Sequence, residues 1–148
     1  NFKEWIVNRV AQRKKVFEEN PLFSIVVPTY ETNKTHLKEM IESVRNQTYV
    51  NWELVLADAS TTTAVEDVVK TYDDARIVYL KLAKNAGISA NTNEGILKAK
   101  GDYIALLDHD DLLTKDALYE VASMIENEKN AGKPIAKMQT VWYNTRNR

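Results

Sequence analysis

Four short apolar runs, each followed by a segment with helical spacing of its apolar residues, constrain the fold of this chain most. The runs lie at residues 23–27, 52–57, 76–82 and 103–107. Largely continuous apolar runs of this length are typical of strands buried on both faces of a sheet. Strand and helix that alternate in this way predict an α/β fold with a doubly wound, mostly parallel, Rossmann-like sheet covered by helices on both faces.

Capping residues set the expected limits of two of the helices. Ser89 is a suitable N-cap for the third helix, which is expected to run to about Lys100 with Gly101 just after its end. Thr114 is the expected N-cap of the fourth helix. Residues 135–143 are one further candidate strand, although their apolar and polar residues alternate only weakly.

Residues 1–20 precede the repeating pattern and are expected to form an N-terminal amphipathic helix that ends before Pro21. Lysines and arginines separate its apolar residues, which are Phe2, Trp5, Ile6 and Val10. We interpret this segment as a helix that packs on its own domain, and contact with a membrane surface is the alternative. Residues 21–148 then form the rest of the chain as one domain.

Composition excludes several classes of protein. The 148 residues are 44% apolar and 28% charged, as in a globular domain with a substantial core. A net charge of −1 gives no electrostatic reason to expect nucleic acid as a partner. The chain has no cysteine, which excludes disulfides and thiolate metal sites. The glycine-rich patterns of dinucleotide-binding and ATP-hydrolysing loops are also absent.

Three carboxylates follow the fourth apolar run within four positions, at Asp108, Asp110 and Asp111. Carboxylates that are held together repel one another, so a fold that gathers them usually supplies a cation. Oxygen ligands favour Mg²⁺ or Mn²⁺, ions that commonly hold phosphates. Taken alone, the stretch fits equally well a solvated turn whose acids cap the next helix.

Polar residues follow each predicted strand, at the sheet edge where ligands bind in folds of this kind. Each residue alone has an ordinary explanation as a turn, cap or solvated residue, but together they favour a ligand site. His109 has three interpretations, as an ion ligand, as a ligand contact or as a spacer between two acids. The candidates are Thr29, Tyr30, Glu31, Asp58, Lys84, Asn85, Asp108, His109 and Asp110.

Several stretches resemble the start of family 2 glycosyltransferases, which have the GT-A, or nucleotide-diphospho-sugar transferase, fold. The resemblance covers roughly residues 22–125, with several motifs in the correct order. The stretches are SIVVPTYE at 24–31, SVRNQTY at 43–49, NWELVLAD at 51–58, KNAGIS at 84–89, NEGI at 93–96, KGDY at 100–103 and DHDD at 108–111.

The resemblance implies inverting transfer of a sugar from a nucleotide-diphospho-sugar donor, commonly UDP-linked, to a hydroxyl on a glycan or another acceptor. It places the nucleoside on residues 29–31 and Asp58, and a divalent Mn²⁺ or Mg²⁺ on Asp110, with Asp108 near the ribose or the ion. Such enzymes build surface polysaccharides, generally in the cytoplasm at the inner face of the membrane. Peripheral membrane association of the full-length protein is therefore expected. Many relatives carry two acids after the second strand, where this chain has only Asp58, and a basic residue at the position of Thr92.

The same resemblance places the catalytic base, usually an aspartate or glutamate, in the second half of the domain. The last acids here, Glu120, Glu126 and Glu128, belong to the fourth predicted helix. We therefore expect the chain to be truncated, with its base and acceptor half beyond Arg148. Alone, it is expected to bind nucleotide and metal weakly, if at all, and to transfer sugar inefficiently. Two alternatives remain at this point. One is a non-catalytic nucleotide-sugar-binding domain, and the other is a phosphotransferase similar to the haloacid dehalogenases, whose fold also opens with Asp-x-Asp.

Overall fold

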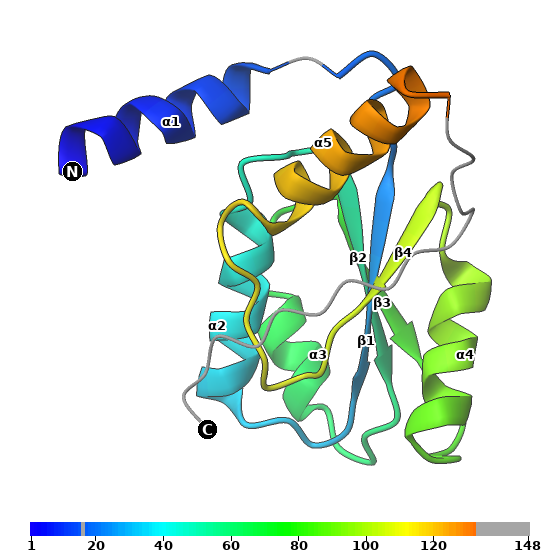
Figure 1. Cartoon of the computed structure of the whole chain (residues 1–148). Coiled ribbons are helices and arrows are strands. Elements are labelled where there is room, and N and C mark those ends of the chain that lie inside the picture. The colour runs from blue at the N-terminus through cyan, green and yellow to red at the C-terminus, as the bar shows by residue number, and fades with distance from the viewer. Residues whose placement is uncertain (16, 133–148) are drawn as a thin grey trace.

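A computed structural model describes residues 1–15 and 17–132 (Figure 1). The candidate strand at 135–143 lies outside this range. Strands and helices alternate after the first helix, as the sequence predicts. The elements are α1 (Phe2–Lys14), β1 (Phe23–Thr29), α2 (Lys34–Arg45), β2 (Trp52–Asp58), α3 (Ala64–Val69), β3 (Ile77–Lys81), α4 (Ile88–Lys98), β4 (Tyr103–Leu106) and α5 (Ala117–Asn130).

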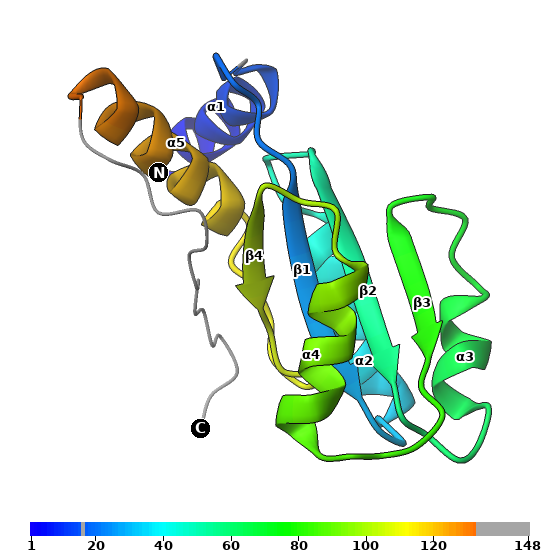
Figure 2. The same ribbon diagram turned by 90° about the vertical axis from the view of Figure 1, so that its right-hand side faces the viewer.

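The four strands form one parallel sheet in the order β3-β2-β1-β4, which confirms the predicted α/β fold. The chain runs from β1 through β2 to β3 and then crosses back to place β4 on the other side of β1 (Figure 2). The strand order therefore reverses between β1 and β4. In open α/β sheets this reversal leaves a crevice at the carboxyl ends of the two strands, where ligands bind.

The two faces of the sheet have different partners. Ile25 and Leu54 belong to one buried apolar cluster that also contains residues of α2, α3 and α5. The opposite face is covered by α4 (Figure 2). Gly95 of α4 lies so close to this face that an added Cβ would be 2.6 Å from Val26 Cγ1. The absence of a side chain at Gly95 thus sets how near α4, and the loop before it, come to the sheet.

The helix limits differ from the predictions for two helices. Gly87, not Ser89, is the N-cap of α4, because its positive φ of 94° turns the chain directly into the helix. The N-cap of α5 is Asp116 rather than Thr114. The carbonyl of Thr114 accepts hydrogen bonds from Ala117 N–H and from Gln47 Nε2, so residue 114 belongs to a turn before the helix.

Gly101 does not end α4 as predicted, because the helix stops at Lys98 with Ala99 as its C-cap. Its N–H instead donates to Ser24 Oγ at 2.7 Å. A Cβ at Gly101 would lie 2.8 Å from the carbonyl oxygen of Leu22, so this glycine permits close contact with the start of β1.

The N-terminal helix is shorter than predicted, and most of its apolar side chains stay exposed although it contacts its own domain. Helix α1 ends at Lys14, and Phe2 and Val7 are 72% and 64% exposed. Charged side chains join it to the start of α5: Arg9 pairs with Asp116 at 3.3 Å, and Lys115 Nζ lies 5.0 Å from the centre of the Trp5 ring. Basic residues occur on the same side of the helix as the apolar ones, so it lacks a purely apolar face to bury. Within the residues placed by the structure, no helix is both long and apolar enough to cross a bilayer.

Candidate functional site

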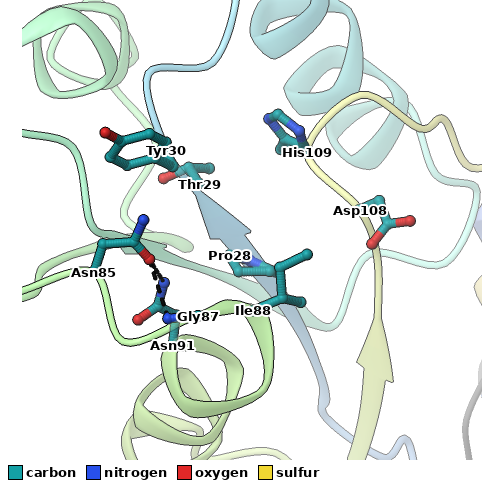
Figure 3. Close-up of a pocket in the computed structure, with 9 residues that line it drawn as sticks. All are labelled: Pro28, Thr29, Tyr30, Asn85, Gly87, Ile88, Asn91, Asp108 and His109. Carbon is teal, nitrogen blue, oxygen red and sulfur yellow. Dashed lines mark hydrogen bonds between the residues drawn. The ribbon is translucent and has the colours of Figure 1, made fainter.

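A cavity of about 300 Å³ opens at the carboxyl ends of β1 and β4, at the point where the strand order reverses (Figure 3). The loop after β3 and the start of α4 form its other side. This placement agrees with the predicted rim of polar residues. The cavity is lined by Pro28, Thr29, Tyr30, Asn85, Gly87, Ile88, Asn91, Asp108 and His109.

Asp58 lies behind this cavity rather than on its wall, and it is completely buried. Its Oδ1 accepts hydrogen bonds from Thr29 Oγ1 at 3.1 Å and from the N–H and Oγ of Ser60 at 3.1 and 2.6 Å. Its Oδ2 accepts from Tyr79 OH at 2.5 Å. Burial, followed by this bond to the carboxylate, raises the pKa of Tyr79. Asp58 therefore holds the ends of β1, β2 and β3 together, and its contact with a nucleoside stays a prediction.

Glu31 joins the loop after β1 to the loop after β2. Its carboxylate accepts hydrogen bonds from the N–H groups of Thr61 and Thr62 at 2.8 and 3.0 Å, and from Thr62 Oγ1 at 2.6 Å. The Thr62 hydroxyl bond is the main reason that the pKa of Glu31 is lowered. Its backbone has a φ of 46°, a left-handed conformation that costs energy for a residue other than glycine. The predicted nucleoside contact of Glu31 is not tested by these bonds.

The start of α4 faces the cavity with backbone N–H groups and no capping side chain. Asn85 Oδ1 accepts from Gly87 N–H at 3.1 Å and from Asn91 Nδ2 at 2.9 Å, which fixes the turn into the helix (Figure 3). A helix N-terminus of this kind favours an anionic group. Lys84, which was predicted in the same set, lines a separate cavity with Lys81 and does not reach this one.

Asp108 and His109 line the cavity opposite Asn85 (Figure 3), and Asp110 follows them in the chain without forming part of the wall. His109 Nδ1 is 2.6 Å from Thr32 Oγ1. Across residues 1–15 and 17–132, no three His, Cys, Asp or Glu side chains form a metal-binding group. Mg²⁺ and Mn²⁺ are commonly held by only one or two carboxylates, with phosphate and water oxygens as the other ligands. Asp108, on the cavity wall, suits that mode, and Asp110 as an ion ligand stays a prediction.

Three residues that build the site were not among those predicted from the sequence. Ser60 lies two positions after Asp58, a spacing typical of an Asx turn, so this partner was recognisable. Asn91 is a polar residue buried on the sheet side of α4, and helical periodicity alone places it there. Thr32 carries no sequence signal, because its bond to His109 spans 77 positions.

The model of the family described as "Glycosyl transferase family 2" matches residues 24–147, which is most of the chain. This chain belongs to glycosyltransferase family 2. Membership confirms the resemblance inferred from the motifs and removes the phosphotransferase alternative. The buried strands and the cavity are thus parts of a GT-A domain.

Two related proteins are much longer than the part of them that matches this chain. The y4gI protein of Sinorhizobium fredii is 42% identical over 132 residues, which are 87% of this chain and 14% of that protein. The O-antigen biosynthesis protein RfbC of Myxococcus xanthus is 33% identical over 82% of this chain and 10% of its own length. The family 2 chain therefore spans a small part of these relatives.

Solved structures with the same fold include two complexes with nucleotide sugars. TarS of S. aureus, in complex with UDP-GlcNAc, superposes with a TM-score of 0.65 and 26% identity over 72% of this chain and 32% of that one. The mannosyltransferase PcManGT of Pyrobaculum calidifontis was solved with GDP-Man and Mn²⁺. It gives a TM-score of 0.60 with 22% identity over 77% of this chain and 36% of its own. The agreement confirms the GT-A fold.

Proposed function

We propose that this chain is the sugar-donor-binding part of an inverting, metal-dependent glycosyltransferase. Its donor is a nucleotide-diphospho-sugar, and its acceptor is a hydroxyl of a glycan or another molecule. The observation that carries the proposal is the cavity at the switch point, which has Tyr30 and the start of α4 on its wall together with Asp108. A nucleoside diphosphate requires the same combination of an aromatic surface, an anion site and oxygen ligands for a cation.

Each side of the cavity has a part in this reaction. Tyr30 is 48% exposed at the mouth and offers a face for the base, while the N–H groups at the start of α4 attract the diphosphate. Asp108 and Asp110 would hold Mn²⁺ or Mg²⁺. The bound cation would neutralise the charge that develops on the nucleoside diphosphate as it leaves. Transfer with inversion then requires a base on the far side of the sugar.

The proposed nucleotide is UDP, and the proposed setting is polysaccharide or glycan synthesis. TarS, which is 26% identical, binds UDP-GlcNAc in its crystal structure. RfbC, which is 33% identical, is named for O-antigen biosynthesis. Both observations belong to those proteins and support the same role here.

The acids of α5 do not supply the base. Glu120, Glu126 and Glu128 lie on a helix at the opposite end of the sheet from the carboxyl ends of the strands (Figure 1). The sequence contains no aspartate or glutamate after Glu128. We therefore expect these 148 residues to bind the sugar donor weakly and to transfer sugar inefficiently.

Calorimetric titration of UDP and GDP, with and without Mn²⁺, tests the donor site. We expect Mn²⁺-dependent binding of UDP that weakens at least about tenfold in Asp110→Asn, because loss even of a residue that only supports a metal ligand typically costs about 10- to 100-fold in metal affinity. Asp73→Asn is the matched control, because Asp73 is exposed and remote from the cavity. The proposal is contradicted if neither nucleotide binds, or if a nucleotide binds equally well with and without Mn²⁺. Binding without sugar transfer, even in the longer natural protein, favours the non-catalytic alternative.

The place of action that we propose is the cytoplasm at the inner face of the membrane, with α1 as a peripheral contact. Its exposed Phe2, Trp5 and Val7 lie among lysines and arginines, a combination that suits an anionic lipid surface. Co-sedimentation with phosphatidylglycerol vesicles should exceed that with phosphatidylcholine vesicles and should fall when residues 1–14 are removed. Equal recovery of both proteins argues against this contact.

A further inference from the structure

The bond between Thr32 and His109 joins two parts of the site that lie far apart in the sequence. Thr32 Oγ1 is 2.6 Å from His109 Nδ1, and Thr32 is only 5% exposed. Thr32 follows β1, and His109 separates Asp108 from Asp110 after β4. The bond therefore crosses the switch point beside the cavity.

This bond gives His109 a defined orientation and makes it more than a spacer between two acids. The imidazole borders the cavity, and Figure 3 shows it on the side of Thr29 and Tyr30. Because Nδ1 is engaged with Thr32, Nδ1 can bind an ion only if this bond breaks, whereas the bond does not involve Nε2. The structure thus favours a role in which His109 positions its neighbours.

The loop that carries Thr32 is also fixed on its other side. Glu31 precedes Thr32, and its carboxylate accepts the N–H groups of Thr61 and Thr62 after β2. Its own N–H donates to Ser60 Oγ at 2.8 Å. A displacement of this loop is therefore transmitted through Thr32 to His109, which is covalently joined to both acids.

We propose that Thr32 and His109 are positioning residues that couple nucleoside binding to binding of the divalent ion. The inference rests on the proposed function. A nucleoside against Tyr30 orders the loop after β1, and the Thr32–His109 bond then orders the segment with Asp108 and Asp110. The coupling is reciprocal, because each ligand raises the affinity of the other by the same factor. Order established before binding lowers the entropy cost of binding.

Three variants separate this coupling from the direct attraction between the ion and the diphosphate. Thr32→Val removes the hydroxyl but keeps the side-chain size, and Thr32→Ser keeps the hydroxyl. Thr35→Val is the matched control, because Thr35 is exposed in the first turn of α2. The readout is the ratio of the UDP dissociation constants without and with Mn²⁺.

We expect Thr32→Val to lower this ratio roughly three- to tenfold, the scale of one lost hydrogen bond, while Thr32→Ser and Thr35→Val keep it. His109→Phe should lower it similarly, and the double variant should lower it no further, because both changes remove the same bond. A merely structural role would weaken UDP binding equally with and without Mn²⁺. An unchanged ratio in Thr32→Val therefore overturns the coupling.

The wild-type protein distinguishes failure of this inference from failure of the proposed function. If UDP binds measurably in both conditions and more tightly with Mn²⁺, the donor site stands and the variants decide the coupling. If UDP binding is absent, or is indifferent to Mn²⁺, the proposed function and the coupling are both overturned. Urea unfolding of Thr32→Val, His109→Phe and the double variant tests the Thr32–His109 bond without any ligand. If the double variant loses as much unfolding free energy as the two single variants added together, the two side chains do not interact and the inference is overturned.

Discussion

A single carboxylate, Asp58, shows how a buried charge organises the site. Its two oxygens accept four hydrogen bonds, from Thr29, Tyr79 and twice from Ser60. Lys81 Nζ lies 4.0 Å away and supplies a positive charge. A buried carboxylate is tolerated because its partners replace the water that it loses. The same partners hold Thr29 at the cavity wall.

Removing this carboxylate should therefore mainly lower the stability of the fold around the site, rather than remove a contact with the nucleotide. We expect Asp58→Ala to lower the free energy of unfolding by about 3 kcal/mol, because several buried donors lose their acceptor. Tyr79→Phe, which removes one donor, should cost about 1 kcal/mol. Urea denaturation measures both. If Asp58→Ala keeps full stability and loses only UDP binding, the carboxylate is a direct nucleotide contact instead.

The sequence predicted many of the residues on the cavity wall, although Lys84 and Asp110 do not line it, and it did not predict what each residue does. Thr29, Tyr30, Asn85, Asp108 and His109 line one cavity because parallel strands end at one edge, and strand patterns reveal where strands end. Side-chain partners depend on loop conformation, which those patterns do not contain. Glu31 turns to the next loop because its backbone has a positive φ, and nothing in the sequence signals that.

Among the elements, the edge strand β3 depends on a charged turn at its start. Asp74 accepts hydrogen bonds from Arg76 at Nε, at Nη2 and at its backbone N–H, at 2.9–3.0 Å. The guanidinium lies 3.8 Å from the centre of the Trp52 ring. The side-chain bond from Arg76 is the largest cause that lowers the pKa of Asp74 from 3.8 to about 2.

This shift predicts how stability depends on pH. The ionised Asp74 is favoured in the folded state, so its contribution is complete above pH 3.8 and is lost as the pH falls towards 2. The contribution is about 1–2 kcal/mol, allowing for screening at Arg76, whose side chain is 37% exposed. In Asp74→Asn, the loss of unfolding free energy between pH 5 and pH 2 should shrink by this amount. Asp73→Asn should lose as much unfolding free energy between pH 5 and pH 2 as the wild-type protein. If its loss shrinks as in Asp74→Asn, the pH dependence does not come from Asp74.

Element type was easier to predict from the sequence than element limits. Apolar spacing in α2 and the buried run of β2 identified those elements, because burial imposes a period that the sequence must follow. The starts of α4 and α5 differed from the predicted caps by two residues. Several residues near each start have suitable side chains, and tertiary bonds such as that from Gln47 to the Thr114 carbonyl decide between them.

Over the whole molecule, α1 and the segment after it contribute very differently to stability. Helix α1 is attached through partly exposed charges, whereas Phe17 is buried in the main core against Tyr49 and Tyr119. Exposed ion pairs contribute little to folding, and a buried aromatic ring contributes much. The sequence suggested one helix for both, because the spacing of their apolar residues is continuous.

Deleting residues 1–14 should therefore lower the free energy of unfolding by less than about 1 kcal/mol. Phe17→Ala should lower it by about 3–5 kcal/mol, because it leaves a cavity in the core. Thermal or urea unfolding of the two proteins measures the difference. A comparable loss in both would mean that α1 packs on the domain in solution.

The place of β4 in the sheet also dictates when the site can exist during synthesis on the ribosome. Strand β4 pairs with β1, the earliest of these four strands in the chain, and the residues between them include β2 and β3. The first three strands can pair as soon as they emerge, because each lies beside its predecessor. The cavity wall formed by Asp108 and His109 closes only after the chain has emerged through Asp111. Neither nucleotide nor cation can therefore assist the early steps of folding, and both can stabilise only the last.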